Sequence, residues 1–549
     1  MKLKMNIISI LAIATFFMSC AEIPESQPDT GSGEVVANDN TYSPSKVRFI
    51  LDSQQKKMID FFMAGADKTS GMCLNSSQWG GTLTTGATGM GFMNIVAGVE
   101  RGWITREDGL NQILKVVKFL DTADRYHGSW SHWYDSNGKS LTFGNQIAAG
   151  EIVETAFVMA GLIAAKEYFN GADQKEAELR SYVDKFWNEV DWSNFVYNDK
   201  LYWIWHSNKT GSSAYEHALT GWNETLIVYI LAMAAPEGHN VSPNVYRKCW
   251  QSNGGIYRAN QTVYNYKQPL GRPANQDGLF LAQYSFLGLD PRHMADQYVN
   301  YWDHVTAYTM INRHYCVYEA PEEHGYSELA WGITACDGAG PSAGYEGRTP
   351  RNDDGVLCTS ASVSSLPYTP FYCTQVLMNL NQNWSFMNGK YGFKTSFHPG
   401  SGMASSYYLG MEHAPQAVMI ENYRSGLLWN LVMKNDHIKK GLELAGITEP
   451  QYKEGFYLAM PESVTGVYDM MRHPDREKYE VDYFSEASGK GEVRIISDEG
   501  KLVYKFDVEL NAGRNVISFF KEDIIRGKEY KLMVKGASGS QKSIDIKLN

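Results

Sequence analysis

Between residues 46 and 447, the pattern of apolar and polar positions predicts two kinds of helical segment, which alternate along the chain. Segments of the first kind are apolar on all sides and rich in small residues: 89–99, 148–165 and 225–235. Segments of the second kind, 106–121 and 174–190, carry charges along one face, and Thr105 is a predicted N-cap for the first of them. In a ring of helical hairpins the inner helices are buried on all sides and the outer ones keep one face in water. We therefore predict a mainly α fold over residues 46–466, an α/α toroid; a generic helical bundle is the alternative.

The pattern changes after about residue 468. Residues 491–510 alternate apolar and polar positions around an Asp498-Glu499-Gly500 turn, and 528–536 and 543–549 continue the alternation. This period of two with turn residues between the runs predicts strands joined as hairpins. We predict a small C-terminal β-sandwich over residues 467–549. It has no cluster of His, Asp or Trp, so we assign it an accessory role.

The first 20 residues contain two lysines, an apolar stretch too short to span a bilayer, and Cys20 directly after Ser19. This is typical of a secretory signal, and the position of Cys20 resembles the bacterial lipoprotein box, although Phe17 and Met18 depart from its usual Leu-Ala. Residues 21–45 have the composition of a flexible tether. We expect an exported lipoprotein, anchored to the inner or outer membrane through Cys20. A periplasmic protein with an ordinary cleavage site is the alternative.

Composition narrows the substrate class. The chain of 549 residues has a net charge of −11, which argues against nucleic acid and anionic membrane surfaces as partners. Its 34 Tyr and 14 Trp are an aromatic excess that suits a neutral ligand. The six cysteines after Cys20 lack C-x-x-C spacing, and the sequence has no P-loop, no dinucleotide-binding G-x-G-x-x-G and no H-E-x-x-H. We predict no metal and no cofactor.

Glu151 and Glu154 are the only ionisable groups in the apolar run 148–165. On a helix they lie three residues apart, so both can face one cavity. Burying an unpaired carboxylate costs several kcal/mol in effective terms, so such a group is either paired or used. A position at the helix N-terminus, where the dipole favours negative charge, is the alternative for Glu151.

Other carboxylates also stand beside aromatic residues. The candidates are Glu224, Glu328, Asp337 and Asp353. Acidic residues next to Trp and Tyr fit a sugar site, in which rings stack on pyranose faces and a carboxyl pair acts as acid and base. Structural roles compete with this interpretation: Asp353 and Asp354 could form a turn, and Glu421 and Arg424 an intrahelical ion pair.

Two further motifs carry little weight. The string G-x-S-x-G occurs at 340–344 around Ser342, but in a Gly-rich loop rather than at a strand-to-helix turn, so a serine nucleophile is not expected. His127 and His132 flank Trp130, and this spacing alone does not predict a metal site.

Several stretches resemble the bacterial glycoamylase-like family, which includes endo-β-1,2-glucanases. They are VERGWITREDGLNQILKVVKFL, GWNETLIVYILA, SFLGLDPR, INRHYC, SELAWGITACDG, SSLPYTP and ENYRSGLLWNLVMKN. The matches run from about Phe61 to Gly446 in the family's order. The resemblance implies an (α/α)6 barrel with a cleft at one end and inverting hydrolysis.

The family's acidic motif is Asp-x-Gly-Gly-Asp-x-Val-Glu-Thr, and the corresponding stretch here is IAAGEIVET. Glu154 keeps the last acid and Glu151 replaces the middle Asp. Ile147 stands in place of the first Asp, a departure that puts the mechanism or the linkage specificity in doubt.

From these observations we expect an exported glycoside hydrolase that acts on a β-glucan, most plausibly β-1,2-linked. Glu154 is the expected catalytic carboxyl, with Glu151 assisting, and the partner acid is sought among Glu224, Glu328, Asp337 and Asp353. Expected sugar contacts are His132, Trp133, Trp203, Trp205, Trp222, Trp331, Tyr368 and Arg424. The alternatives are hydrolysis of another glycan, such as an α-glucan, and a surface lipoprotein that binds glycan without cleaving it.

Overall fold

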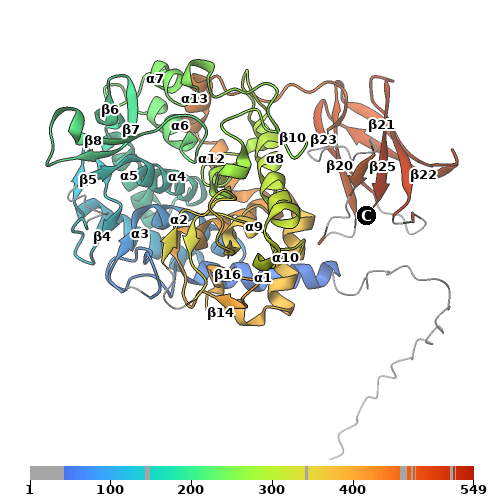
Figure 1. The fold of residues 1–549 in the computed structure, drawn as a ribbon. Coiled ribbons are helices and arrows are strands. Elements are labelled where there is room, and N and C mark those ends of the chain that lie inside the picture. Colours follow the sequence, from blue (N-terminus) through green and yellow to red (C-terminus); the bar gives the residue numbers. More distant parts are fainter. Residues whose placement is uncertain are drawn as a thin grey trace, which may run out of the picture. The chain divides into compact units, whose positions relative to one another are not determined.

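The computed structural model describes residues 43–548 apart from 79, 142–148, 341–343, 458–466, 471–473, 476–477, 520–523 and 526 (Figure 1). The predicted signal segment 1–20 with Cys20, most of the tether, Ile147 and Ser342 lie outside the described residues. Helix α1 (Pro44–Asp60) begins inside the predicted tether 21–45. Among the described residues, no helix is both long and apolar enough to cross a membrane.

The fold is helical up to about residue 447, and one set of helices is buried almost completely. It comprises α2 (Thr85–Glu100), α4 (Ile152–Tyr168), α6 (Leu226–Ala234), α9 (Thr359–Val363) and α11 (Gly410–Ser425). Helix α2 packs on α4, α4 on α6, α9 on α11, and α11 on α2. Between α6 and α9 lie 3₁₀ turns at Leu279–Ala282 and Ser285–Leu287. The Gln283 side chain in this stretch donates to the Ala361 carbonyl and to Ser365, so the buried elements contact one another in a closed order.

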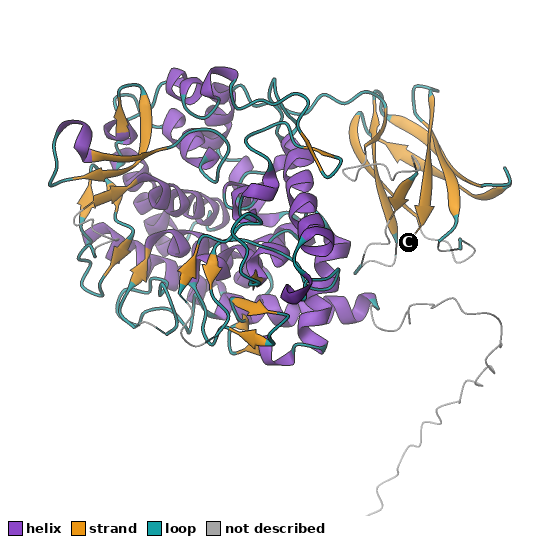
Figure 2. Cartoon of the chain, viewed as in Figure 1, coloured by secondary structure: helices purple, strands orange, loops and turns teal. Residues whose placement is uncertain are grey.

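A second set of helices packs outside the first. It comprises α1, α3 (Arg106–Thr122), α5 (Gln174–Glu189), α7 (Pro243–Lys248), α8 (Tyr301–His314), α10 (Pro370–Gln382), α12 (Leu427–Met433) and α13 (Asp436–Ala445). Helix α1 packs on α11, α3 on α2, α5 on α4, α13 on α6, α8 on the turn at 279–282, and α10 on α9. The Thr105 side chain accepts from the Asp108 amide, as predicted for an N-cap. Figure 2 shows these helices in purple.

The apolar run 148–165 is not one helix. Residues Ala149–Glu151 form strand β5, which pairs antiparallel with β7 (Lys200–His206), and α4 starts only at Ile152. An entirely apolar run has no period that separates a strand from a helix, so the sequence pattern placed the helix start too early. The apolar segment 89–99 lies within α2, which begins earlier, at Thr85.

Short strands line the loops of the helical region. They are β1 (Leu83–Thr84), β2 (Arg125–Tyr126), β3 (Ser129–Trp130), β4 (Trp133–Tyr134), β6 (Val196–Tyr197), β8 (Tyr215–Ala218), β9 (Thr262–Val263), β10 (Tyr266–Lys267), β11 (Cys336–Asp337), β12 (Tyr345–Glu346), β13 (Leu357–Cys358), β14 (Asn388–Gly389), β15 (Gly392–Phe393), β16 (Ser396–His398) and β17 (Met403–Ala404). Strand β1 pairs with β4, and β6 and β8 both pair with β7. The six cysteines described are buried and unpaired.

The C-terminal region is β-rich. One sheet has the order β18 (Gly455–Tyr457), β20 (Tyr479–Ser485), β23 (Gly513–Phe519). The other has the order β19 (Tyr468–Met470), β25 (Gln541–Leu548), β24 (Glu529–Lys535), β21 (Gly489–Ser497), β22 (Leu502–Leu510). Side chains from both sheets form one hydrophobic cluster, separate from that of the helices. Strands β21 and β22 form a hairpin across the predicted turn at 498–500.

Candidate active site

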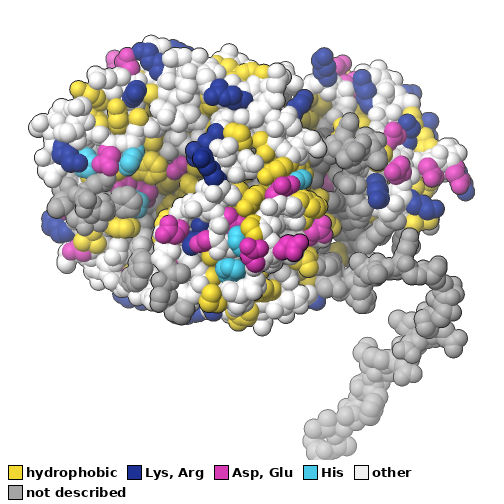
Figure 3. All heavy atoms as spheres, in the orientation of Figure 1, with side chains coloured by type: hydrophobic (Ala, Val, Ile, Leu, Met, Phe, Trp, Pro, Cys, Tyr) yellow, Lys and Arg dark blue, Asp and Glu magenta, His cyan; other side chains and the backbone are white. Residues whose placement is uncertain are grey.

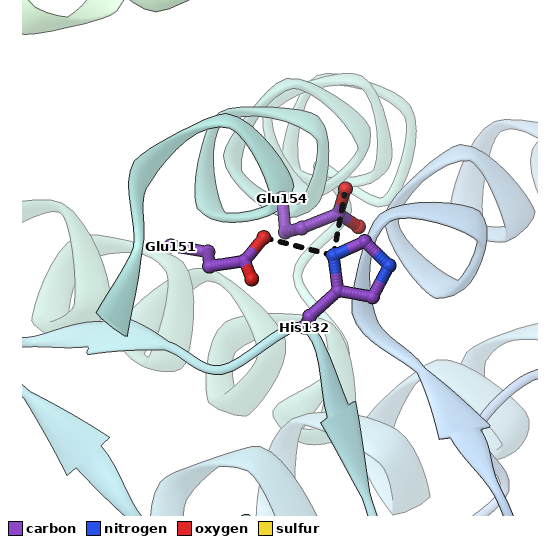
Figure 4. A group of neighbouring side chains, drawn as sticks. All are labelled: His132, Glu151 and Glu154. Carbon is purple, nitrogen blue, oxygen red and sulfur yellow. Dashed lines mark hydrogen bonds and ion pairs between the residues drawn. The ribbon is translucent and has the colours of Figure 1, made fainter. Parts of the chain in front are cut away.

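Glu151, Glu154 and His132 form a compact buried group. His132 Nδ1 lies 2.8 Å from Glu151 Oε2 and 3.6 Å from Glu154 Oε1. Figure 4 shows both carboxylates, one from the end of β5 and one from the first turn of α4, directed at the imidazole ring. The Trp203 indole on β7 also donates to Glu151, at 3.2 Å. Glu151 occupies the N-cap position of α4, but its side chain makes no capping hydrogen bond. The buried carboxylates are therefore explained by this cluster and not by helix capping.

Glu154 is held from its other side by the start of a neighbouring helix. The Gly86 amide, in the first turn of α2, donates to Glu154 Oε2 at 2.6 Å. The two helices approach so closely here that a Cβ on residue 86 would overlap this oxygen. Glycine is the residue that permits such a contact.

The charges in this group depend on one another. Burial lowers the pKa of His132, but the negative charges of Glu151 and Glu154 and the hydrogen bond to Glu151 outweigh it and raise this pKa to about 9. Burial raises the pKa of Glu154, Glu151 raises it further, and His132 and the Gly86 amide oppose the rise. At neutral pH the imidazole is therefore protonated and lies between two acids.

Within the described residues, these three side chains form a set of potential ligand atoms that all lie within 4.8 Å of one another. The distance from His132 Nδ1 to Glu151 is that of a hydrogen bond, and a protonated nitrogen has no lone pair for a metal. We interpret the group as a hydrogen-bonded ion pair.

Glu224 is a second buried acid on the same side of the fold. It lies just before α6, and burial together with the charges of Glu154 and Asp277 raises its pKa to about 7. The Ser285 hydroxyl donates to its carbonyl and so fixes the backbone. A carboxyl group with this pKa is partly protonated at neutral pH, as a general acid requires.

Glu412, in the first turn of α11, is a buried acid that the sequence analysis missed. Burial and the charge of Asp337 raise its pKa to about 8, and a hydrogen bond from Tyr345 opposes the rise. Asp337 on β11 is itself buried, which raises its pKa, while Tyr407 and Arg348 lower it. Glu412 begins a buried helix just as Glu154 does. That shared pattern, an acid in the opening turn of an apolar helix, is the signal that would have found it.

Two other predicted acids have different surroundings. The Glu328 side chain is 62% exposed and faces Arg313. Asp353 accepts hydrogen bonds from Tyr315, Tyr326 and the Gly355 amide and pairs with His324. Neither acid is joined to the cluster around Glu154 by these contacts, and their role as the partner acid stays a prediction.

The predicted aromatic residues divide into two groups. Trp133, Trp203 and Trp205 are half-buried on β4 and β7, next to the acidic cluster. Trp331 is completely buried, whereas Tyr368 is 3% exposed and its hydroxyl donates to the Ala282 carbonyl. A ring without an exposed face cannot stack on a sugar, so the platform role predicted for Trp331 is wrong; that of Tyr368 stays a prediction.

Trp222 is largely buried but also borders a cavity. It packs against His304 and Trp250 in the core, yet its edge lines a cavity of about 600 Å³. Asn223, Asp277, Phe280 and Arg272 also line this cavity. Two of its lining residues, Trp222 and Asn223, directly precede Glu224 in sequence. Figure 3 shows a hollow in which acidic, histidine and apolar side chains lie together.

Arg424 is part of an outer ion-pair network. It pairs with Asp52 on α1 and donates to Gln55, whereas Glu421 pairs with Arg101. The intrahelical pair Glu421–Arg424 is therefore wrong, and these contacts join α11 to α1 and α2. They leave the predicted sugar contact of Arg424 without support.

Residues 216–436 match the family model described as "Glycoamylase: Putative glucoamylase". The endo-β-1,2-glucanase of Chitinophaga pinensis, solved with sophorotriose and glucose, is 33% identical, with a TM-score of 0.70 over 74% of this chain and 99% of that chain. The chain belongs to the glycoamylase-like family. Glu224 and Glu412 both lie within the matched segment, whereas His132, Glu151 and Glu154 precede it.

Comparisons with curated proteins and with solved structures both find similarity between this glycoamylase-like chain and protein from Parabacteroides distasonis. A β-1,2-glucanase of known crystal structure is 34% identical, with a TM-score of 0.68 over 73% of this chain and 60% of that chain. An exo-β-1,2-glucooligosaccharide sophorohydrolase acting at the non-reducing end is 36% identical over 415 residues, which is 72% of this chain. The match spans only 57% of that curated relative.

Proposed function

We propose that this protein hydrolyses β-1,2-glucans or their oligosaccharides. The observation that carries the proposal is the set of buried acids at the starts of neighbouring inner helices: Glu154, Glu224 and Glu412. Each has a raised pKa, and half-buried tryptophans lie next to Glu154. Glycoside hydrolysis needs one protonated and one ionised carboxyl beside a surface that stacks on sugar rings. The relatives named for action on β-1,2-glucan support the linkage.

In the proposed reaction Glu224 is the general acid. It donates its proton to the glycosidic oxygen as the bond to the anomeric carbon breaks, and the leaving sugar departs with a free hydroxyl. Glu154 is the general base. It removes a proton from a water that attacks the anomeric carbon from the opposite face, so the configuration inverts. Glu151 positions this group, and Trp133, Trp203 and Trp205 stack on or contact the sugar.

We also propose that the helical region is an (α/α)6 barrel and that the C-terminal region is a β-sandwich accessory domain. The closed order of contacts from α2 through α11, with an outer helix packed on each element, supports the barrel. The cluster of side chains shared by the two C-terminal sheets supports the sandwich. The proposed boundary at residue 466 falls at the end of a segment outside the described residues.

Export and a lipid anchor on Cys20 remain proposals from the sequence. The anchor would hold the enzyme at a membrane, in contact with polysaccharide or oligosaccharide. Globomycin, which blocks the lipoprotein signal peptidase, should cause the precursor to accumulate, and Cys20→Ala should release the protein from the membrane fraction. Labelling with a fatty-acid analogue that persists in Cys20→Ala would contradict the anchor.

The experiment that tests the function is product analysis over time. Residues 43–549 are incubated separately with β-1,2-glucan, β-1,3-glucan, starch and xylan. We expect short oligosaccharides from β-1,2-glucan alone. Sophorose as the earliest product would indicate exo action, and a spread of lengths endo action. Turnover of another glycan only, or binding to β-1,2-glucan without turnover, would contradict the proposal.

A further inference from the structure

The position of the His132 side chain is fixed by its surroundings. Its carbonyl accepts from the Thr85 amide at the start of α2. The preceding Ser131 donates to the Ala149 carbonyl of β5, and its own carbonyl accepts from the Thr85 hydroxyl. These hydrogen bonds tie the segment that carries His132 to β5, which carries Glu151, and to α2, whose Gly86 amide holds Glu154. The imidazole is thus built into the group.

One atom of His132 contacts both acids. Nδ1 lies 2.8 Å from Glu151 and 3.6 Å from Glu154, and both carboxylates are almost completely buried. Two neighbouring buried carboxylates cannot both ionise unless a positive charge compensates them. In the described part of the chain, no Lys or Arg forms an ion pair with either acid. His132 is the cation that this arrangement contains.

We propose that His132 is a positioning residue that, as an imidazolium, holds Glu151 in place and keeps Glu154 available as an ionised base. This inference rests on the proposed function, in which Glu154 accepts a proton from water. It replaces the direct sugar contact expected for His132 from the sequence.

Several further groups of the described residues interact with the two acids beside the imidazole. Glu151 comes from β5 and Glu154 from α4, and Glu224, which precedes α6, interacts with Glu154. Trp203 on β7 and the Gly86 amide on α2 donate to the two acids but carry no charge. Among the described residues, the negative charges that raise the pKa of His132 are those of Glu151 and Glu154.

Two substitutions separate the hydrogen bond of His132 from its charge. In His132→Asn the amide nitrogen takes the position of Nδ1, so the hydrogen bond to Glu151 is kept and the charge is lost. In His132→Gln the amide reaches the position of Nε2, and both are lost. We expect the acidic limb of the kcat/KM profile of His132→Asn to move up by one pH unit or more. At pH 6 the kcat/KM of His132→Asn should be at least tenfold lower than that of wild type, and at pH 8 this difference should be smaller. The kcat/KM of His132→Gln should be at least tenfold lower than that of wild type at both pH values.

A raised KM with an unmoved acidic limb in His132→Asn would overturn the proposal, because it would indicate a sugar contact. So would stoichiometric binding of Mn²⁺ or Zn²⁺ by calorimetry to the wild-type protein that is lost in His132→Asn, because it would indicate a metal ligand.

A spectroscopic measurement keeps the test independent of turnover. In histidine-labelled wild-type protein, with His132 assigned by its absence from His132→Asn or His132→Gln, we expect both ring nitrogens to stay protonated up to about pH 9. A neutral ring at pH 7 would overturn the inference. If the ring is protonated but the wild-type protein cleaves no β-1,2-glucan, the proposed function is wrong, whereas the assignment of His132 as an imidazolium is confirmed.

Discussion

Glu154 on α4 and Gly86 on α2 are joined by a 2.6 Å hydrogen bond at a point where only glycine fits. The amide holds one carboxylate oxygen, while the other faces His132. The contact fixes the direction of the carboxyl group, because a carboxylate held at one oxygen cannot rotate freely. The precision of a catalytic group depends on such support.

Gly86→Ala should therefore lower kcat at least tenfold. The added methyl group pushes the Glu154 carboxylate away from its hydrogen-bond donor, and small displacements of reacting groups are costly. Steady-state kinetics on β-1,2-gluco-oligosaccharides measures the effect. Gly80→Ala is the matched control, since a Cβ at residue 80 meets no atom within 4 Å. Equal activity of the two variants would contradict the role of this contact.

Glu224→Gln should reduce kcat by roughly 10²–10⁴-fold, the usual contribution of a general acid. A substrate with a nitrophenyl leaving group should restore much of the rate, because that group departs without protonation. In the wild-type protein the rate should fall as pH rises past about 7, the pKa of this carboxyl. Glu328→Gln, at an exposed acid, should stay within twofold of wild type. Loss of rate with the activated substrate too would argue against the acid role.

Glu412 gives a prediction for stability. Burial raises its pKa from 4.5 to about 8, so the folded state holds this proton more tightly than the unfolded chain does. Wild-type stability should therefore fall as pH rises from about 4.5 to 8, whereas Glu412→Gln has no proton to lose. The stability of the variant relative to wild type should rise over this range by up to about 1.4 kcal/mol per pH unit. Thermal unfolding at several pH values tests this, and a pH-independent difference would contradict it.

Trp331 and Trp203 should respond differently to substitution by Phe. Trp331 is completely buried, so Trp331→Phe should cost about 1–3 kcal/mol of stability and leave KM unchanged. Trp203 is half-buried and donates to Glu151, so Trp203→Phe should lower activity with little change in stability. Unfolding curves and kinetics on both variants measure the two effects. A raised KM in Trp331→Phe alone would indicate that Trp331, and not Trp203, contacts the substrate.

The sequence pattern predicted the helical architecture well because burial on all sides and burial on one face leave distinct signatures. It also singled out Glu151 and Glu154, since a charge in an apolar run is conspicuous. It misplaced the start of α4 because the run 148–165 has no period that separates the strand at 149–151 from the helix that follows. Helix boundaries depend on pairing with β7, which is distant in sequence.

The predictions that failed depended on contacts between distant segments. Glu421 and Arg424 have the spacing of an ion pair, but each finds a partner on another helix, Arg101 and Asp52. Trp331 stands beside an acid in sequence, yet its ring points into the core. Glu412 was missed although it stands, like Glu154, in the opening turn of a buried helix. Composition near a residue does not tell which way its side chain faces.

We propose that Glu154 acts as the base of a β-1,2-glucan hydrolase. The most direct test compares the products formed from β-1,2-glucan by the wild-type protein, Glu154→Gln and Glu328→Gln at equal concentration, with folding checked by circular dichroism. We predict short β-1,2-linked oligosaccharides from wild type and Glu328→Gln, and at least 10³-fold less product from a folded Glu154→Gln. Full activity of Glu154→Gln on this glycan would contradict the account.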